Sequence, residues 1–84
     1  LHIYPTPAVD EVTISFGIKD IETVRIEVYD LHGKVVINES RLLNAGLNKA
    51  KLDISMLSNG VYFVRLHTSL KETAKKLVVI NGKN

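Results

Sequence analysis

The chain has 84 residues, of which 45% are hydrophobic and 24% are charged, so it has the composition of one small globular domain and not of a disordered segment. It contains no cysteine, which excludes disulfide frameworks, thiolate metal sites and cysteine nucleophiles. The formal net charge is +2, divided between −3 in residues 1–42 (4 Lys or Arg, 7 Asp or Glu) and +5 in residues 43–84 (7 against 2). A basic half favours an acidic partner, although surface charge more often serves only to solvate strand faces. No apolar run approaches the roughly 20 residues that cross a bilayer, so we expect no membrane insertion.

The N-terminal segment 1–7 is predicted to run extended at the edge of a sheet. Pro5 and Pro7 have no backbone N–H for a central ladder, and each restricts the residue before it. This segment is therefore predicted to be an edge strand or an extended segment that crosses the edge of the sheet.

Strands are predicted wherever apolar and polar residues alternate. Residues 11–16, 24–29 and 48–54 show this pattern, with Thr13 and Ser15 among the residues predicted to point outward. The residues predicted to point inward are Val12, Ile14, Phe16, Val24, Ile26, Val28, Ala50, Leu52 and Ile54.

Turn signals separate these strands. Asp30-Leu31-His32-Gly33 predicts a tight turn with Gly33 in the left-handed position, after which residues 34–38 return as a hairpin partner. Residues 39–47 are predicted as a longer loop. One helical turn is expected over residues 53–57, with Leu57 plugging the edge of the core.

The central strand is predicted over residues 61–68, because the turn signal Ser58-Asn59-Gly60 runs directly into an alternating segment. Tyr62, Val64 and Leu66 would point inward. Tyr62 follows the turn glycine by two residues, which is the spacing of a tyrosine corner, in which the phenol packs in the core and its hydroxyl bonds the backbone upstream.

The last predicted strand covers residues 73–80, and its end, 77–80, is apolar on both faces. This pattern favours a strand buried between two neighbours, or a face that awaits a partner, and it leaves dimerisation through this strand open. Residues 81–84 are predicted as a polar tail.

About seven short strands with frequent turn signals predict an all-β fold, an Ig-like antiparallel β-sandwich of Greek-key type. The whole of residues 1–84 would form one domain.

We find no spacing typical of a catalytic nucleophile, a phosphate-binding loop or a metal site, and His2, His32 and His67 do not cluster. No cofactor is therefore expected. Tyr29 and Phe63 on the outer face are interpreted as cross-strand stabilisers and not as a base-stacking surface, so no nucleic-acid partner is expected.

Five stretches together resemble a known family, the C-terminal sorting domains of the type IX secretion system (Por secretion system) of Gram-negative bacteria. The resemblance spans nearly the whole chain, in the right order, with Thr6 where the family usually has Asn. The stretches are Ile3-Tyr4-Pro5-Thr6-Pro7-Ala8, Val12-Thr13-Ile14, Val28-Tyr29-Asp30-Leu31-His32-Gly33-Lys34-Val35-Val36, Leu52-Asp53-Ile54-Ser55 with Leu57-Ser58-Asn59-Gly60-Val61-Tyr62-Phe63-Val64-Arg65, and Lys75-Lys76-Leu77-Val78-Val79.

The resemblance implies a secretion signal and not an enzyme, although the protein that carries it can be one. The domain would direct a cargo from the periplasm across the outer membrane, to the cell surface or the extracellular space. Its partners would be the outer-membrane translocon, shuttle proteins and a sortase-like peptidase that usually removes the domain, after which the cargo is released or anchored to the surface.

The same resemblance implies two groups of residues. Recognition by the translocon or the sortase would involve Pro5, Pro7, Lys75, Lys76, Leu77, Val78 and Val79, whereas Tyr4, Gly33, Gly60 and Tyr62 would serve as structural motif residues. A second interpretation, left open by the residues alone, is an adhesive or carbohydrate-binding module of an exported protein. Such a module normally presents a row of aromatic side chains, for which only Tyr29 and Phe63 are candidates.

Overall fold

Alternation of apolar residues produces strands along the whole chain. The structure, a computed structural model, describes residues 1–82 and contains seven strands. Among these residues, no helix is long and apolar enough to cross a membrane. The strands are β1 (His2–Tyr4), β2 (Glu11–Ile18), β3 (Glu22–Tyr29), β4 (Val35–Leu43), β5 (Gly46–Asp53), β6 (Gly60–His67) and β7 (Glu72–Val79).

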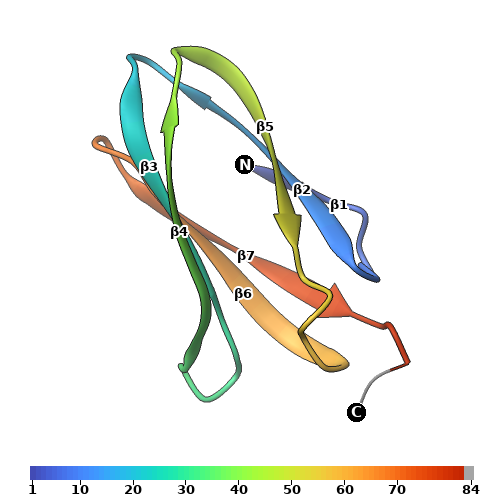
Figure 1. Cartoon of the computed structure of the whole chain (residues 1–84). Coiled ribbons are helices and arrows are strands. Elements are labelled where there is room, and N and C mark those ends of the chain that lie inside the picture. Colours follow the sequence, from blue (N-terminus) through green and yellow to red (C-terminus); the bar gives the residue numbers. More distant parts are fainter. Residues whose placement is uncertain (83–84) are drawn as a thin grey trace.

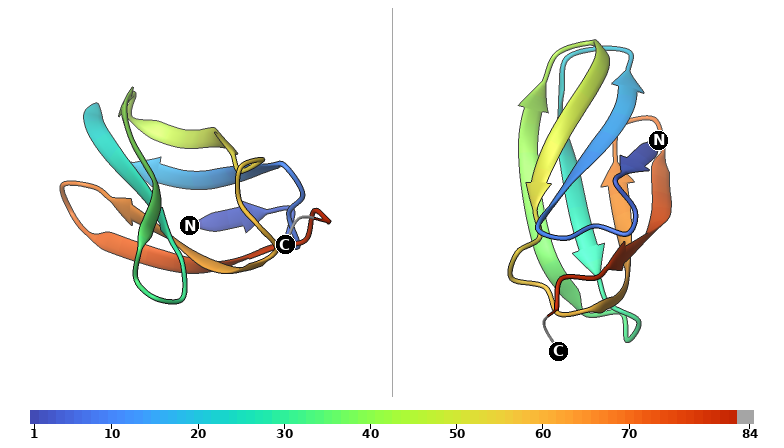
Figure 2. Two further views of the ribbon diagram at one scale, coloured as in Figure 1. Left: turned by 60° about the horizontal axis from the view of Figure 1, so that its bottom comes forward. Right: turned by 90° about the vertical axis from the view of Figure 1, so that its right-hand side faces the viewer.

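The strands form two sheets that pack face to face (Figure 1; Figure 2). One sheet has the order β1-β2-β5 and the other the order β4-β3-β6-β7, and every pair of neighbouring strands is antiparallel. Partners that are distant in sequence, β2 with β5 and β3 with β6, are joined by connections between the sheets, as in a Greek key. This arrangement confirms the predicted Ig-like antiparallel sandwich, with β6 in a central position and β1 at an edge.

The core lies between the sheets and consists of the inward faces of the strands. Every residue that alternation placed inward is buried, including Tyr62, Val64 and Leu66 of β6. Leu57 is also buried, at 4% exposure, as expected. Its N–H bonds the Ile54 carbonyl oxygen at 3.0 Å, so this segment is a single hydrogen-bonded turn and not the helical turn that was predicted.

The outward assignment of Ser15 gave the wrong exposure. Its neighbours Ile14 and Phe16 face the core, so Ser15 does point away from it, yet it is only 9% exposed. The reason is lateral cover: Ser15 lies on the middle strand of its sheet, between His2 of β1 and Lys49 of β5. Alternation predicts which face of the sheet a side chain lies on, but not which side chains of the neighbouring strands cover it.

The predicted loop over residues 39–47 is wrong. β4 continues to Leu43 and β5 begins at Gly46, so the connection between them is only two residues long. Val24 to Glu22 of β3 pair with Arg41 to Leu43 of β4, and Gly46 supports the tight reversal with φ of 108°. The sequence hid this extension because β4 is an edge strand in which Ile37 is the one buried residue among the described positions.

The prediction that the last strand lies between two neighbours is also wrong. β7 is an edge strand: β6 pairs with it along its length, and on its other side the described residues contribute only an isolated bridge from Ala8. Leu77 and Val79 are nevertheless fully buried, because the facing sheet covers them. Of the predicted polar tail, Asn81 and Gly82 follow β7, and Lys83 and Asn84 lie outside the described residues.

Candidate recognition site

Backbone contacts bring three of the quoted stretches together at one end of the sandwich. They are the loop before β2, the loop before β6 and the end of β7, and Figure 1 shows the last two side by side. We call this region the motif end and define it by residues 5–10, 54–60 and 78–81. Its residues are far apart in sequence, so the fold alone creates it.

Ala8 joins the loop after β1 to β7. Its N–H donates to the carbonyl oxygen of Val78 at 2.8 Å, and its own carbonyl oxygen accepts from the N–H of Ile80 at 2.9 Å. These bonds form an isolated parallel bridge to β7, and the Ala8 side chain is fully buried. Pro5 and Pro7 lie exposed beside this bridge, and the peptide bonds before both prolines are cis.

The loop before β6 is held from two sides. The Tyr62 hydroxyl donates to the Ser58 carbonyl oxygen at 2.8 Å, and the ring is 8% exposed, which confirms the predicted tyrosine corner. From the other side, Asn81 donates its backbone N–H to the side-chain oxygen of Asn59 and its side-chain amide to the carbonyl oxygen of Leu57, both at 2.7 Å. The residues after β7 therefore bind the same loop that Tyr62 stabilises.

The turn between β3 and β4 has the predicted tight geometry. The Asp30 carboxylate accepts hydrogen bonds from the N–H groups of Lys34 (3.0 Å) and His32 (2.8 Å), and Gly33 adopts φ of 83°. These bonds, that from Lys34 first, hold the pKa of Asp30 below its usual value. Gly60 does not share the left-handed conformation of Gly33: its φ of 158° is close to that of an extended strand.

A shallow groove of about 180 Å³ separates this turn from the loop before β6. Asp30, Leu31 and His32 line one wall, and residues 59–62 line the other. The quoted stretch 28–36 thus borders the motif end, and Leu31 exposes 65% of its surface there.

The structure separates the predicted recognition residues of β7 into two kinds. Leu77 and Val79 are buried, so they position the strand, whereas Val78 is half-buried and Lys75 and Lys76 are exposed. Neither lysine forms an ion pair with any described residue. The two lysines project from opposite faces of β7, since Lys75 pairs with inward-facing Val64 and Lys76 with outward-facing Phe63.

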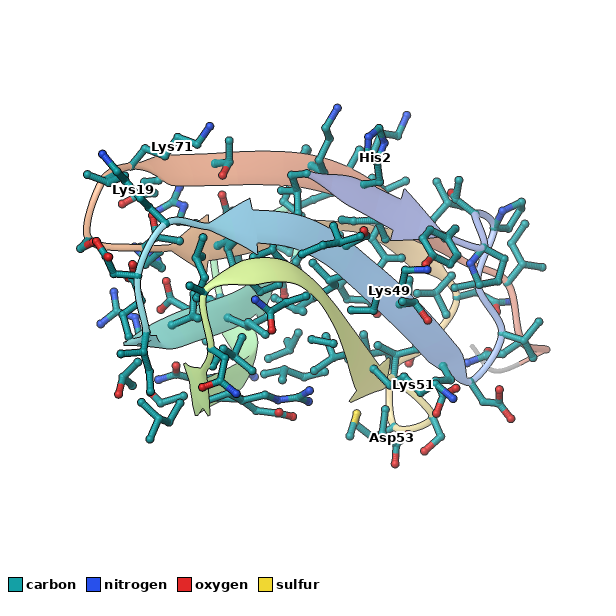
Figure 3. The ribbon with its side chains drawn as sticks, turned by 90° about the horizontal axis from the view of Figure 1, so that it is seen from above. His2, Lys19, Lys49, Lys51, Asp53 and Lys71 are labelled. Carbon is teal, nitrogen blue, oxygen red and sulfur yellow. The ribbon has the colours of Figure 1, made fainter. Side chains whose placement is uncertain are left out.

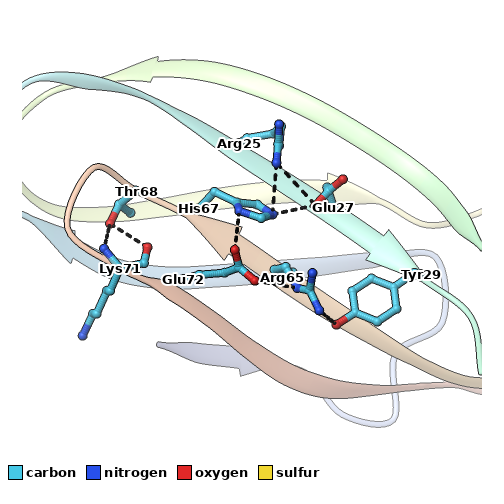
Figure 4. A network of polar contacts seen from close by, with 8 residues as sticks. All are labelled: Arg25, Glu27, Tyr29, Arg65, His67, Thr68, Lys71 and Glu72. Carbon is cyan, nitrogen blue, oxygen red and sulfur yellow. Dashed lines mark hydrogen bonds and ion pairs between the residues drawn. The ribbon is translucent and has the colours of Figure 1, made fainter. Parts of the chain in front are cut away.

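The outer face of the four-stranded sheet carries a network of charges that neutralise one another (Figure 4). His67 lies between two carboxylates, with its Nε2 atom 2.5 Å from Glu27 and its Nδ1 atom 3.0 Å from Glu72. Arg65 lies 3.2 Å from Glu72 and donates to the Tyr29 hydroxyl at 2.8 Å. Sequence reading missed this network, because only the strand register brings its members together.

The same face contains the two aromatic candidates for ligand binding. Tyr29 and Phe63 are cross-strand partners with ring centroids 6.0 Å apart, as predicted for sheet stabilisers. The Arg65 guanidinium lies 4.8 Å from the centre of the Tyr29 ring. That ring already has a cationic partner and is not a free platform for a sugar.

The outer face of the three-stranded sheet differs, since its cations are not paired. His2, Lys49 and Lys51 stand over this sheet, with Asp53 at one end and Lys19 and Lys71 at the other (Figure 3). Neither Lys49 nor Lys51 takes part in an ion pair within residues 1–82, and neither does His2. No group of three or more His, Cys, Asp or Glu in the described part of the chain could hold a metal ion.

Comparison with known proteins agrees with these motifs. A family model described as "Secretion system C-terminal sorting domain" matches residues 2–80. Beta-agarase D of Zobellia galactanivorans is 31% identical over 81 residues, which cover 96% of this chain and 15% of that protein. The chain thus spans about 15% of the length of this relative. Since the family model covers nearly the whole chain, the chain belongs to the family of C-terminal sorting domains, which are signals for type IX secretion and direct export to the cell surface or the extracellular space.

Proposed function

We propose that residues 1–84 act as one sorting domain of a larger exported protein, and that the secretion machinery reads the domain through β7 and the loop that is bridged to it. The partners would be the outer-membrane translocon with its shuttle proteins, followed by a sortase-like peptidase that removes the domain and leaves the cargo released or anchored. The domain's role is recognition, and any catalytic activity belongs to the cargo. A relative named Beta-agarase D supports an enzyme as one class of cargo.

The observation that carries this proposal is the bridge between Ala8 and β7. It places the exposed Pro5 and Pro7 next to the end of the strand that presents Lys75 and Lys76. A partner that contacts the strand therefore meets the proline loop on the same side of the molecule. Leu77 and Val79 contribute by holding the strand against the core, and Tyr4, Gly33, Gly60 and Tyr62 by shaping the loops.

An export assay tests the proposal. Residues 1–84 are fused to the C-terminus of a periplasmic reporter in a bacterium that has the type IX system, and the reporter is measured outside the cell. We expect export of the fusion, and loss of export when residues 75–84 are deleted. The Phe63→Ala variant serves as the control, because Phe63 is not among the residues proposed for recognition, although it pairs with Lys76, and the variant should still be exported.

Two outcomes would contradict the proposal. Retention of the folded wild-type fusion in the periplasm would show that the chain is not sufficient as a signal. Equal loss of export in the deletion and in Phe63→Ala would indicate misfolding as the common cause. The alternative of a carbohydrate-binding module is weakened by the Arg65 contact to Tyr29, which occupies the ring that a sugar would need.

A further inference from the structure

We propose that the open edge of β7 binds an extended, acidic segment of a secretion-machinery protein, which adds to the four-stranded sheet as a fifth strand. This inference rests on the proposed function and names the chemistry of the partner. We call residues 72–76 on the free side of β7 the open edge.

The direction of the backbone groups identifies this edge. Val78 gives its carbonyl oxygen, and Ile80 its N–H, to Ala8 on the side away from β6. Backbone groups alternate between the two sides of a strand, so those of Ala74 and Lys76 also point away from β6. No described residue bonds them, because β7 is the last strand of its sheet. They are therefore available to a further strand.

The Ala8 bridge limits where such a strand can lie. Ala8 covers the edge at Val78 and Ile80, which leaves the N-terminal part of β7 uncovered. An incoming segment would pair with residues 72–76 and end against the Ala8 loop, close to Pro5 and Pro7. The bridge thus limits the pairing of an incoming strand to residues 72–76.

Charge selects the partner. Lys75 and Lys76 project from opposite faces of β7, and neither forms an ion pair with a carboxylate of the described residues. The nearby carboxylate of Glu72 already contacts Arg65 and His67. Adjacent residues of an incoming strand also project from opposite faces. A strand with two adjacent acidic residues would therefore place one carboxylate near each lysine.

The same charges disfavour a second copy of this chain. Two β7 edges paired with each other would bring four unpaired lysines together, and charged residues at a sheet edge are a usual means of preventing such pairing. The opposite edge of the sheet, β4, does not offer the same chemistry. Its charged residues Glu39 and Arg41 form an ion pair at 2.7 Å, and Arg41 also bonds the backbone of Lys51.

Proline substitutions test the edge directly. Ala74→Pro removes an N–H that points away from β6 and places the ring at the edge, a position where proline is compatible with a strand. Ser40→Pro, on the other edge strand β4, is the matched control. Arg41 and Glu39 pair with Val24 and Ile26 of β3, whose backbone groups point toward β4. The N–H of Ser40, which lies between Glu39 and Arg41, therefore points away from β3, out of the sheet edge. Both variants are fused to the reporter, and the folding of both is checked by thermal unfolding of the 84-residue chain.

We expect Ala74→Pro to lower export by about tenfold, the scale of one or two lost hydrogen bonds, with Ser40→Pro exported like the wild type. Export of Ala74→Pro at the wild-type level would overturn the inference while leaving the sorting function intact. Failure of the wild-type fusion to leave the periplasm would instead overturn the sorting function itself.

Charge reversal tests the acidic partner without touching the backbone, so it decides the question even when a proline variant does not fold. Lys75→Glu with Lys76→Glu should reduce export, whereas Lys49→Glu with Lys51→Glu, the same change in charge on the other sheet, should not. Unchanged export in the first variant would exclude an acidic strand. Equal loss in both would indicate an effect of net charge and would also refute the inference.

Discussion

Ala8 and Val78, seventy positions apart in the sequence, are joined by a backbone hydrogen bond of 2.8 Å. This bond lets a residue of the first loop close part of the edge of the last strand. The bridge links the proline-containing stretch to β7 and leaves the N-terminal part of β7 open. The distinction between a closed and an open part of one edge is the basis for our inference about the partner.

The burial of Ala8 leads to a prediction about stability. The Ala8→Leu variant should unfold more easily by roughly 1–3 kcal/mol, because extra methylenes do not fit a packed site. Val9→Leu provides the control, since Val9 is 55% exposed. Urea denaturation of both variants measures the difference, and an equal effect of the two substitutions would show that the Ala8 site is not tightly packed.

Tyr62 should contribute to stability through its hydroxyl as well as its ring. Tyr62→Phe removes the hydrogen bond to Ser58 and should cost roughly 0.5–1.5 kcal/mol of unfolding free energy. Tyr4→Phe deletes a hydroxyl from an exposed ring and should be close to neutral. Thermal and chemical unfolding compare the two variants, and a neutral Tyr62→Phe would argue against a stabilising corner.

Gly33 is expected to resist substitution because of its backbone conformation. At φ of 83° a side chain meets the steric penalty of the left-handed region, so Gly33→Ala should destabilise the domain by roughly 1–2 kcal/mol. No atom lies within 4 Å of the added Cβ, so the cost arises from the backbone alone. Gly17→Ala is the control, since the nearest atom to its added Cβ lies at an ordinary distance of 3.9 Å. Similar unfolding midpoints for the two variants would contradict this account.

Asp30 predicts a dependence of stability on pH. Its folded-state pKa lies below the usual value of 3.8, so the ionised form stabilises the folded state. This contribution is complete above the usual pKa and is lost as the pH falls through the lower, folded-state pKa. Comparison of wild type and Asp30→Asn by urea unfolding between neutral and acid pH should show a smaller loss in the variant. Parallel pH profiles would mean that Asp30 does not contribute.

The apolar alternation of the sequence was sufficient to predict the sandwich, its inward faces and the tyrosine corner. These features depend on local spacing, because strand side chains alternate with a period of two and because Tyr62 reaches a carbonyl only four residues away. The family resemblance was also readable from the sequence, since its stretches are contiguous in the chain. The extension of β4 was not readable, because a half-exposed edge strand shows little apolar alternation.

Only the tertiary structure decided which residues are neighbours across the sheets. It covers Ser15 from both sides, assembles the charges around His67 and bridges Ala8 to β7. It also placed β7 at an edge, although its apolar end suggested a strand between neighbours. The physical reason is that a strand can be buried by the facing sheet while its lateral hydrogen-bonding groups remain open. The amino-acid pattern reports burial, whereas lateral pairing depends on the order of the strands.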